Sequence, residues 1–173
     1  MTHVARRSLL AGLVGLSGCG FRPVYAPVGS GGASDRFGEI AVDIIPDRQG
    51  QLLRQALQQH LDVAGSDQHK KYGLAVIYSV AADAISIQRD STSTRTRLIA
   101  SASWTLRNLS SGTSIVTSGS ARMLDGYNII DQQFFAADLE NEDAQRRLAE
   151  SLAGQITLQM AAFFNKNPQR APV

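Results

Sequence analysis

In one stretch of the chain, apolar and polar residues alternate strictly enough to constrain the fold. Between Arg95 and Arg107, apolar residues recur at every second position, and polar or basic residues fill the places between them. A period of two is typical of a β-strand with one face in a core and the other in water, as in many antiparallel sheets. The apolar series is Leu98, Ala100, Ala102, Trp104 and Leu106, and the polar series is Arg95, Arg97, Ser101, Ser103, Thr105 and Arg107.

Neighbouring segments predict the partners of this strand. Residues 72–80 alternate in the same way, and the pattern extends to Ile87; residues 115–124 return after a short loop over 108–112. Connections this short make the three strands antiparallel. An earlier strand is expected over 39–45 and ends at Pro46. Its core side is Ile40, Val42 and Ile44, and Asp125, Gly126, Tyr127 and Asn128 are expected to break the sheet after the last strand.

Two segments have the period of an amphipathic helix. The first covers residues 48–63, with an apolar stripe of Leu52, Leu53, Ala56, Leu57, Val63 and Ala64. His60 falls in this stripe, where we expect a core residue hydrogen-bonded to a neighbour rather than a metal ligand. The second runs from about 138 to 165, with a helical lead-in over 132–137. Its stripe is Leu148, Ala149, Leu152, Ala153, Ile156, Met160, Phe163 and Phe164, and its polar side is Arg147, Glu150, Ser151, Gly154 and Thr157.

These elements predict an α+β fold in the order β-α-β-β-β-α. Both helices cover the apolar face of one four-stranded, mainly antiparallel sheet and form a two-layer sandwich with it. The second helix lacks the lysines that membrane-surface helices carry, so packing on the sheet is favoured. We expect a single domain over residues 39–165 and a tail over 166–173.

The N-terminus has the pattern of a lipoprotein signal. Two arginines precede a short apolar run, and small residues come directly before the only cysteine, Cys19. The run is about half the length of a membrane span. We expect a signal peptide over 1–18 and a lipidated, Gly/Ser-rich tether over 19–38, with S-diacylglycerol and N-acyl groups on Cys19. The alternative is an ordinary signal with a chance cysteine. The arginine pair leaves twin-arginine export open beside the favoured general secretory route.

Charge and cysteine content exclude some classes of function. Without Arg6 and Arg7 the 17 basic residues fall to 15, which equals the number of acidic residues. The net charge of a neutral mature protein gives no indication that it binds nucleic acid. A chain whose single cysteine carries lipid forms no internal disulfide, so its stability comes from the core.

The sequence contains no pattern that indicates catalysis. The mature chain has two histidines, His60 and His69, without the spacing of a metal pair, and it has no nucleophile elbow or phosphate loop. The acidic cluster at 138–143 is explained by the start of a helix. We therefore expect no enzyme, no metal and no cofactor other than the lipid. What remains is a set of arginines that could bind phosphate, meet an acidic partner or simply be solvated: Arg89, Arg95, Arg97, Arg107 and Arg122.

Several motifs resemble the lipopolysaccharide-assembly lipoprotein family LptE. The first is Cys19-Gly-Phe-Arg-Pro-Val-Tyr, and the second is Ile44-Ile-Pro-Asp-Arg-Gln-Gly-Gln-Leu-Leu-Arg54. Three later segments agree: Tyr72-Gly-Leu-Ala-Val, Trp104-Thr-Leu-Arg-Asn108, and the stretch from Phe134 to Leu148. The resemblance covers nearly the whole mature chain. It implies the same two-layer sandwich.

The resemblance also implies a function and partners. Members of the family are outer-membrane lipoproteins that sit as a plug inside the LptD β-barrel and help lipopolysaccharide reach the cell surface. Gly20 is similar to outer-membrane rather than inner-membrane lipoproteins. A basic family position at the tip between the second and third strands corresponds to Arg89, with Arg95 and Arg97 close by as further lipopolysaccharide contacts. A second basic family position is acidic here, near Asp138.

Three other functions stay open from the residues alone. One is an accessory lipoprotein of an ABC-type lipid transporter, and another is a periplasmic lipid carrier, which needs a cavity between the helices and the sheet. Inward-facing Trp104, Phe163 and Phe164 would fill such a cavity. The third is a hydrolase with an unrecognised serine.

Overall fold

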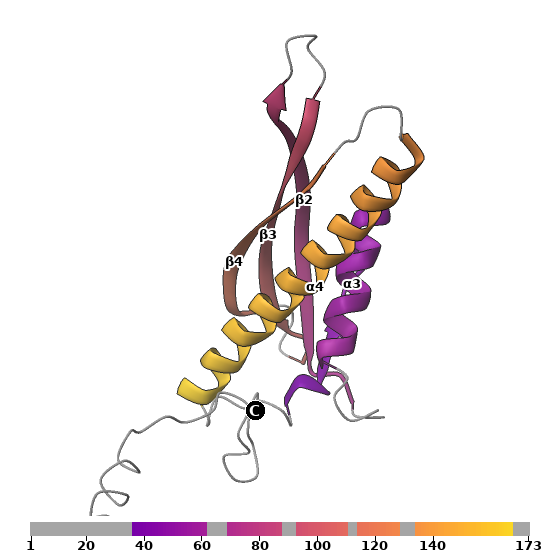
Figure 1. The fold of residues 1–173 in the computed structure, drawn as a ribbon. Helices are drawn as coiled ribbons and strands as arrows, with labels where there is room; N and C mark the ends of the chain where they lie inside the picture. The colour runs from indigo at the N-terminus through magenta and orange to yellow at the C-terminus, as the bar shows by residue number, and fades with distance from the viewer. Residues whose placement is uncertain (1–35, 62–68, 88–92, 111–113, 129–133, 168–173) are drawn as a thin grey trace, which may run out of the picture.

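The computed structural model describes residues 36–61, 69–87, 93–110, 114–128 and 134–167. The elements follow the predicted order, so the α+β fold class is confirmed (Figure 1). They are β1 (Ile40–Val42), α3 (Asp47–Leu61), β2 (Tyr72–Ile87), β3 (Ser93–Asn108), β4 (Ile115–Asn128) and α4 (Phe134–Lys166). The signal peptide, Cys19 and all but the end of the tether lie outside the described residues, as do Val63 and Ala64.

The four strands form one sheet in the order β1-β2-β3-β4. β2, β3 and β4 pair antiparallel, as predicted. β1 is short and pairs parallel with the start of β2, Ile40 opposite Tyr72 and Val42 opposite Leu74. The parallel direction follows from the connection, because α3 carries the chain back to the end of the sheet where β1 began.

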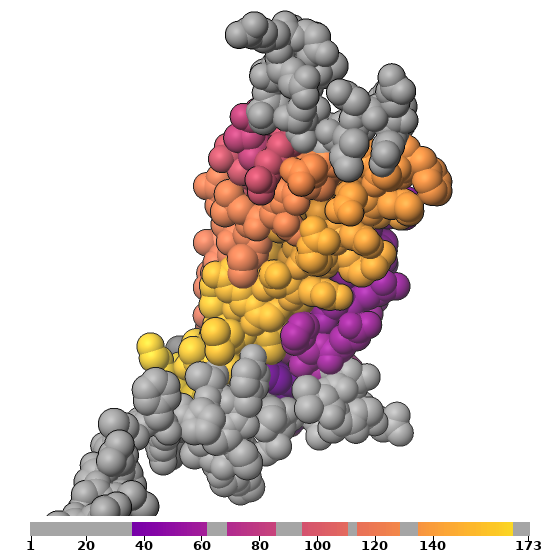
Figure 2. Space-filling model, in the orientation of Figure 1, coloured from indigo at the N-terminus to yellow at the C-terminus, as the bar shows by residue number. Residues whose placement is uncertain are grey.

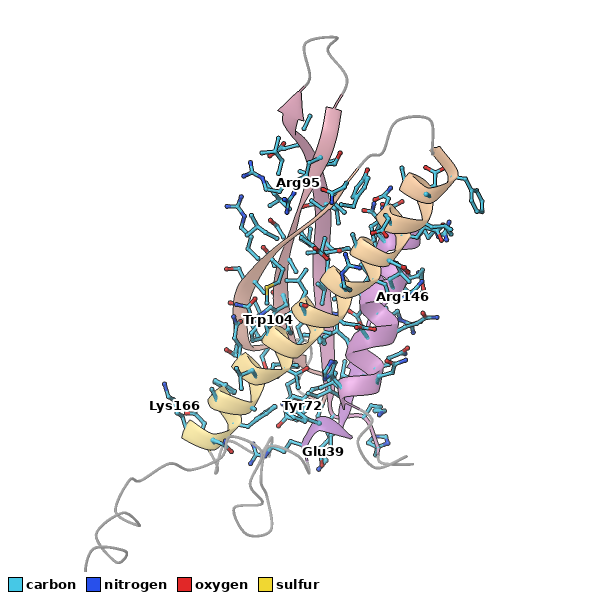
Figure 3. The ribbon with its side chains drawn as sticks, in the orientation of Figure 1. Glu39, Tyr72, Arg95, Trp104, Arg146 and Lys166 are labelled. Atoms are coloured by element: carbon cyan, nitrogen blue, oxygen red, sulfur yellow. The ribbon has the colours of Figure 1, made fainter. Side chains whose placement is uncertain are left out.

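β3 is the central long strand, and its alternation is confirmed. All five of its predicted apolar residues are buried beneath the helices. Trp104 is only 3% exposed, and its indole Nε1 donates to Gln159 Oε1 of α4 at 2.9 Å. Figure 3 places Trp104 between the sheet and α4. The buried polar end of this side chain therefore has a partner, as a buried indole requires.

The two helices form the second layer. α4 packs on β4 and β3, and α3 packs mainly on α4; Figure 2 shows the two side by side on one face. Arg48 at the start of α3 binds Glu142 of α4 at 2.8 Å. At the other end, the Phe164 ring lies 5.8 Å from Tyr72 and 6.5 Å from Phe37, between ring centroids. The apolar layer is therefore closed by aromatic contacts where the described chain begins.

Two predictions about helix residues are wrong. His60 is exposed rather than in the core. Because α3 rests chiefly on α4, its buried stripe is narrow, and His60 lies at the margin beside Gly154, where an added Cβ would be 3.9 Å from its ring. Thr157, expected on the polar side of α4, is only 1% exposed. Its hydroxyl donates to the Ala153 carbonyl at 2.8 Å, which makes its burial tolerable.

Element boundaries also differ from the prediction. β1 ends at Val42, so Ile44 is 78% exposed and Ile45 is buried in its place. β4 continues through Asn128 instead of breaking at Asp125, and Gly126 pairs with Arg97 of β3. α4 starts at Phe134, which lies within the predicted helical lead-in over 132–137.

The turn from β1 into α3 depends on three residues of the second motif. Asp47 has φ of 68°, a left-handed conformation that aspartate tolerates better than most residues. A Cβ on Gly50 would lie 2.7 Å from Ile45 Cγ2 and 3.0 Å from the Ile45 carbonyl oxygen. Gln51 Nε2 donates to that same oxygen at 2.9 Å. The motif therefore builds a tight strand-to-helix turn that holds Ile45 in the core.

Replacing Gly50 with alanine tests this account. We expect Gly50→Ala to lower the free energy of unfolding by roughly 1–3 kcal/mol, because the methyl group has no space against Ile45. Gly154→Ala in α4 is the matched control, since it gains about 0.5–1 kcal/mol of helix propensity in open space. Urea unfolding followed by circular dichroism measures both. Equal effects of the two substitutions would contradict the proposed turn geometry.

Candidate functional site

The face of the sheet away from the helices is uncovered by any described element. Its middle consists mainly of small side chains, so it is flat and polar. The exposed exceptions are Ile77 of β2, at 79%, and Arg122 of β4. The small residues, which share rows across the three long strands, are Ala75, Ser79, Ser101, Ser103, Thr105, Ser118 and Ser120. We call this surface the open face.

Two of the predicted site residues lie together at one end of the open face. Arg95 and Arg97 are neighbours on the same side of β3, near the end of the β2–β3 hairpin (Figure 3). Arg97 Nη2 donates to Asp83 Oδ2 of β2 at 3.3 Å. Arg97 Nε is buried and makes no hydrogen bond with the described residues. The Arg97 side chain as a whole is 43% exposed, so a ligand can reach the outer part of its guanidinium.

A shallow hollow of about 290 Å³ separates these arginines from β4. Gly126 forms part of its wall, and a Cβ there would lie 2.9 Å from the Thr96 carbonyl oxygen and 3.9 Å from Arg95 Nε. The missing side chain lets Arg95 lie close over the strand. The hollow is lined by Ile85, Arg95, Arg97, Leu124, Asp125 and Gly126. Guanidinium groups beside apolar side chains suit a ligand with both phosphate and hydrocarbon parts.

Two of the other predicted arginines, Arg107 and Arg122, do not join this pair. Arg89 lies outside the described residues, as Cys19 does. Arg122 is exposed near the middle of the open face. Arg107 binds Asp43 at the far end of β3, twelve residues from Arg95, or about 40 Å at the rise of an extended strand. The described arginines are therefore spread along the sheet, with Arg95 and Arg97 at one end, Arg122 near the middle and Arg107 at the other end.

Sequence reasoning missed several residues at the hairpin end. Ile85 and Leu124 are 49% and 59% exposed beside the arginine pair, and Asp83 binds Arg97. The registers of β2 against β3 and of β3 against β4 bring them together, and a register is not readable from any one strand. Phe135 and Leu139, one turn apart on α4, are also exposed at 78% and 50%. Neither residue belongs to the apolar stripe that was predicted for this helix.

Tyr78 of β2 faces the helix layer and is half-buried. Burial raises the pKa of its phenol to about 12, because the charged phenolate is poorly solvated there. The group is therefore neutral over the physiological range. It can donate a hydrogen bond but has no acid-base role at neutral pH.

Other chemistry-bearing arrangements do not occur in the described part of the chain. It holds no group of three or more His, Cys, Asp or Glu side chains able to bind a metal ion. None of its helices is long and apolar enough to cross a membrane. A larger hollow of about 480 Å³ opens between β1 and α3, but its two cations, Arg54 and Lys70, already donate to backbone carbonyls of Val42 and Gly38.

The geometry defines an α+β module with one uncovered sheet face, and comparison with known proteins shows its family. The family model LptE, lipopolysaccharide assembly, matches residues 37–160. The chain belongs to this family. Among curated proteins, none matches.

Solved structures share the fold at low identity. A lipoprotein from Caulobacter crescentus CB15 is 23% identical with a TM-score of 0.61, over 77% of this chain and 96% of that one. The rare lipoprotein B from Shewanella oneidensis is 15% identical with a TM-score of 0.53, over 73% and 95%. Lipoprotein B from Nitrosomonas europaea is 14% identical with a TM-score of 0.51, over 76% and 88%.

Titration of Tyr78 tests the burial described above. We expect the absorbance difference between the wild-type protein and Tyr78→Phe to titrate near pH 12 rather than near 10. Below about pH 10 both the folded and the unfolded chain keep the proton. Between about 10 and 12 the unfolded chain loses it first, so the free energy of unfolding falls with rising pH. A Tyr78 signal near pH 10 would show that the phenol is solvated.

Proposed function

We propose that the chain is an outer-membrane lipoprotein that assembles with an LptD-like β-barrel, plugs its lumen and aids lipopolysaccharide transport to the cell surface. The protein acts without catalysis, and its lipid is attached at Cys19. The observation that carries the proposal is the open face. A helix-free, serine-rich sheet surface suits the polar interior of a barrel, because a polar lumen wall needs polar groups opposite it.

The different residues at the two ends of the sheet support the same role. The described chain begins at the end of the sheet that contains Phe37 and Tyr72, and the tether from Cys19 arrives there. Arg95 and Arg97 lie at the opposite end, where the hairpin extends past the start of α4 (Figure 1). A plug anchored at one end and basic at the other would present guanidinium groups to lipopolysaccharide phosphates far from the anchor.

The alternative functions have less support. A lipid carrier needs space between its layers, but Trp104 and Phe164 fill that region with 3% and 2% exposure. No catalytic arrangement of side chains favours a hydrolase in the described residues. An accessory lipoprotein of an ABC-type lipid transporter remains the competing assignment, and it differs in its partner.

A pull-down identifies the partner. The tagged, lipidated chain is purified from detergent-solubilised outer membrane, and co-purifying proteins are identified by mass spectrometry. We expect one stoichiometric large β-barrel. A Cys19→Ser variant controls for the anchor, because it should remain outside the membrane fraction. Recovery of transporter components in place of the barrel would overturn the plug assignment.

Neutralising the arginine pair tests the lipopolysaccharide contact. We expect Arg95→Gln combined with Arg97→Gln to weaken binding of purified lipopolysaccharide by about tenfold or more, since each charge-assisted hydrogen bond contributes roughly 1.5–3 kcal/mol. Arg122→Gln, an exposed arginine elsewhere on the same face, is the control. Thermal unfolding checks that the fold is intact. Equal binding by both variants would remove the hairpin end as the contact.

A further inference from the structure

The hollow between β1 and α3 lies at the end of the sheet where the described chain begins. Its volume is about 480 Å³, and we call it the β1–α3 hollow. Glu39, which directly precedes β1, is labelled at this end of the domain in Figure 3, and Arg95 is labelled at the other. The hollow is therefore separate from the arginine pair. Apolar residues from β1, from the turn before it and from the end of α3 line part of it: Phe37, Ile40, Val42 and Leu61.

Two cations from different segments also line the β1–α3 hollow. Arg54 of α3 is half-buried, and Lys70, which lies just before β2, is exposed. Arg54 Nε lies 3.5 Å from the Val42 carbonyl oxygen, at the outer limit of a hydrogen bond, and Lys70 Nζ donates to the Gly38 carbonyl at 2.7 Å. A guanidinium has five N–H groups and an ammonium has three. Each cation therefore keeps hydrogen-bond donors for a ligand.

The outer edge of β1 supplies further donors. The Glu39 carbonyl accepts a hydrogen bond from β2, and Asp43 N donates to β2, so odd-numbered residues of this segment bond to that strand. Ile40 and Val42 therefore direct their backbone N–H groups away from β2. No described strand pairs with this edge of the sheet, and both residues line the hollow. The backbone amides at a free sheet edge can bind an anion.

The charges around the hollow also favour an anion. The described residues that line it include no aspartate or glutamate. The carboxylates beside β1 are already neutralised, because Glu39 binds Lys71 and Asp43 binds Arg107. The C-terminal end of α3 contributes only about half a negative charge. The two lining cations outweigh it, so the described wall of the hollow is positive.

The geometry points to a binding site for a phosphate monoester in the β1–α3 hollow. The two cations match the charge of this group, which is about −1.5 to −2 near neutral pH. The donors come from three segments, namely β1, α3 and the residue at position 70. Donors spread in this way suit the tetrahedral oxygens of a phosphate better than a planar carboxylate. The apolar residues beside them leave room for the glycerol or hydrocarbon part of an ester.

This inference goes beyond the proposed function and does not rest on it. The site lies at the opposite end of the sheet from Arg95 and Arg97, and it is tested with the isolated, unlipidated chain. Two sources share the same chemistry, a soluble phosphate monoester and the headgroup of a membrane lipid. Phe37 follows Cys19 by 18 residues. Because that length of chain spans at most about 65 Å, a membrane that holds the proposed anchor would be within its reach.

An NMR titration locates the site. The mature chain from residue 19, with Cys19→Ser so that no lipid is attached, is titrated with sn-glycerol 3-phosphate. We expect the backbone amide signals of Ile40 and Val42 to shift. Glycerate, a carboxylate of similar size, should bind more weakly. Shifts confined to Arg95 and Arg97, or equal affinity for glycerate, would overturn the proposal.

Removing the two cations tests the contacts. We expect Arg54→Gln combined with Lys70→Gln to weaken binding of sn-glycerol 3-phosphate by about tenfold or more, because charge-assisted hydrogen bonds are lost. Arg48→Gln combined with Arg146→Gln removes the same charge from exposed positions outside the hollow and should bind like the parent chain. Calorimetric titration measures the affinities, and thermal unfolding checks the fold. Equal weakening by both pairs of substitutions would contradict a specific site.

Vesicles separate the two sources. The Cys19→Ser chain is sedimented with phosphatidylcholine vesicles that contain or lack phosphatidic acid, a phosphate monoester lipid. Binding that requires phosphatidic acid and is lost in the Arg54 and Lys70 double variant would identify a lipid headgroup as the ligand. Binding of sn-glycerol 3-phosphate without vesicle binding would identify a soluble ester. Failure to bind either ligand would overturn the proposal.

Discussion

The register of β3 between β2 and β4 is the constraint on which the rest of the structure depends. Because side chains alternate along a strand, one register decides at once which residues meet the helices and which remain on the open face. Trp104 reaches Gln159 of α4 only in this register. A slip of one residue would bury the arginines and expose the tryptophan. The core and the candidate site are two sides of the same strand pairing.

The turn before α3 shows how a family motif can be structural rather than functional. Asp47, Gly50 and Gln51 lie in the first turns of α3, and all three act on Ile45 or on the backbone near it. The residues that made the resemblance specific are those that fix a tight turn. This part of the family motif therefore reports the fold, while the proposed contacts lie on strands whose sequences are less distinctive.

Local periodicity was sufficient to predict the elements, and tertiary contacts explain what it missed. The alternation of β3 is set by burial on one face, so Leu98 through Leu106 were predictable. His60 and Thr157 depend on how α3 and α4 lie against each other, which a single helical wheel does not contain. Some residues of the candidate site were predictable from the sequence, and others were not. Arg95 and Arg97 follow from one strand, but Asp83 and Leu124 join them through pairing between strands.

The length of β2 has a mechanical consequence. Its 16 residues span about 50 Å, which exceeds the roughly 30 Å thickness of a bilayer's hydrocarbon core. The end of the sheet where the described chain begins and the end that holds Arg95 are therefore separated by the length of this strand (Figure 3). The distance of Arg95 and Arg97 from the opposite end of the sheet is set by the number of residues in β2 and β3. Each matched pair of residues added to or removed from both β2 and β3 would move the arginines by about 7 Å and preserve which face they occupy.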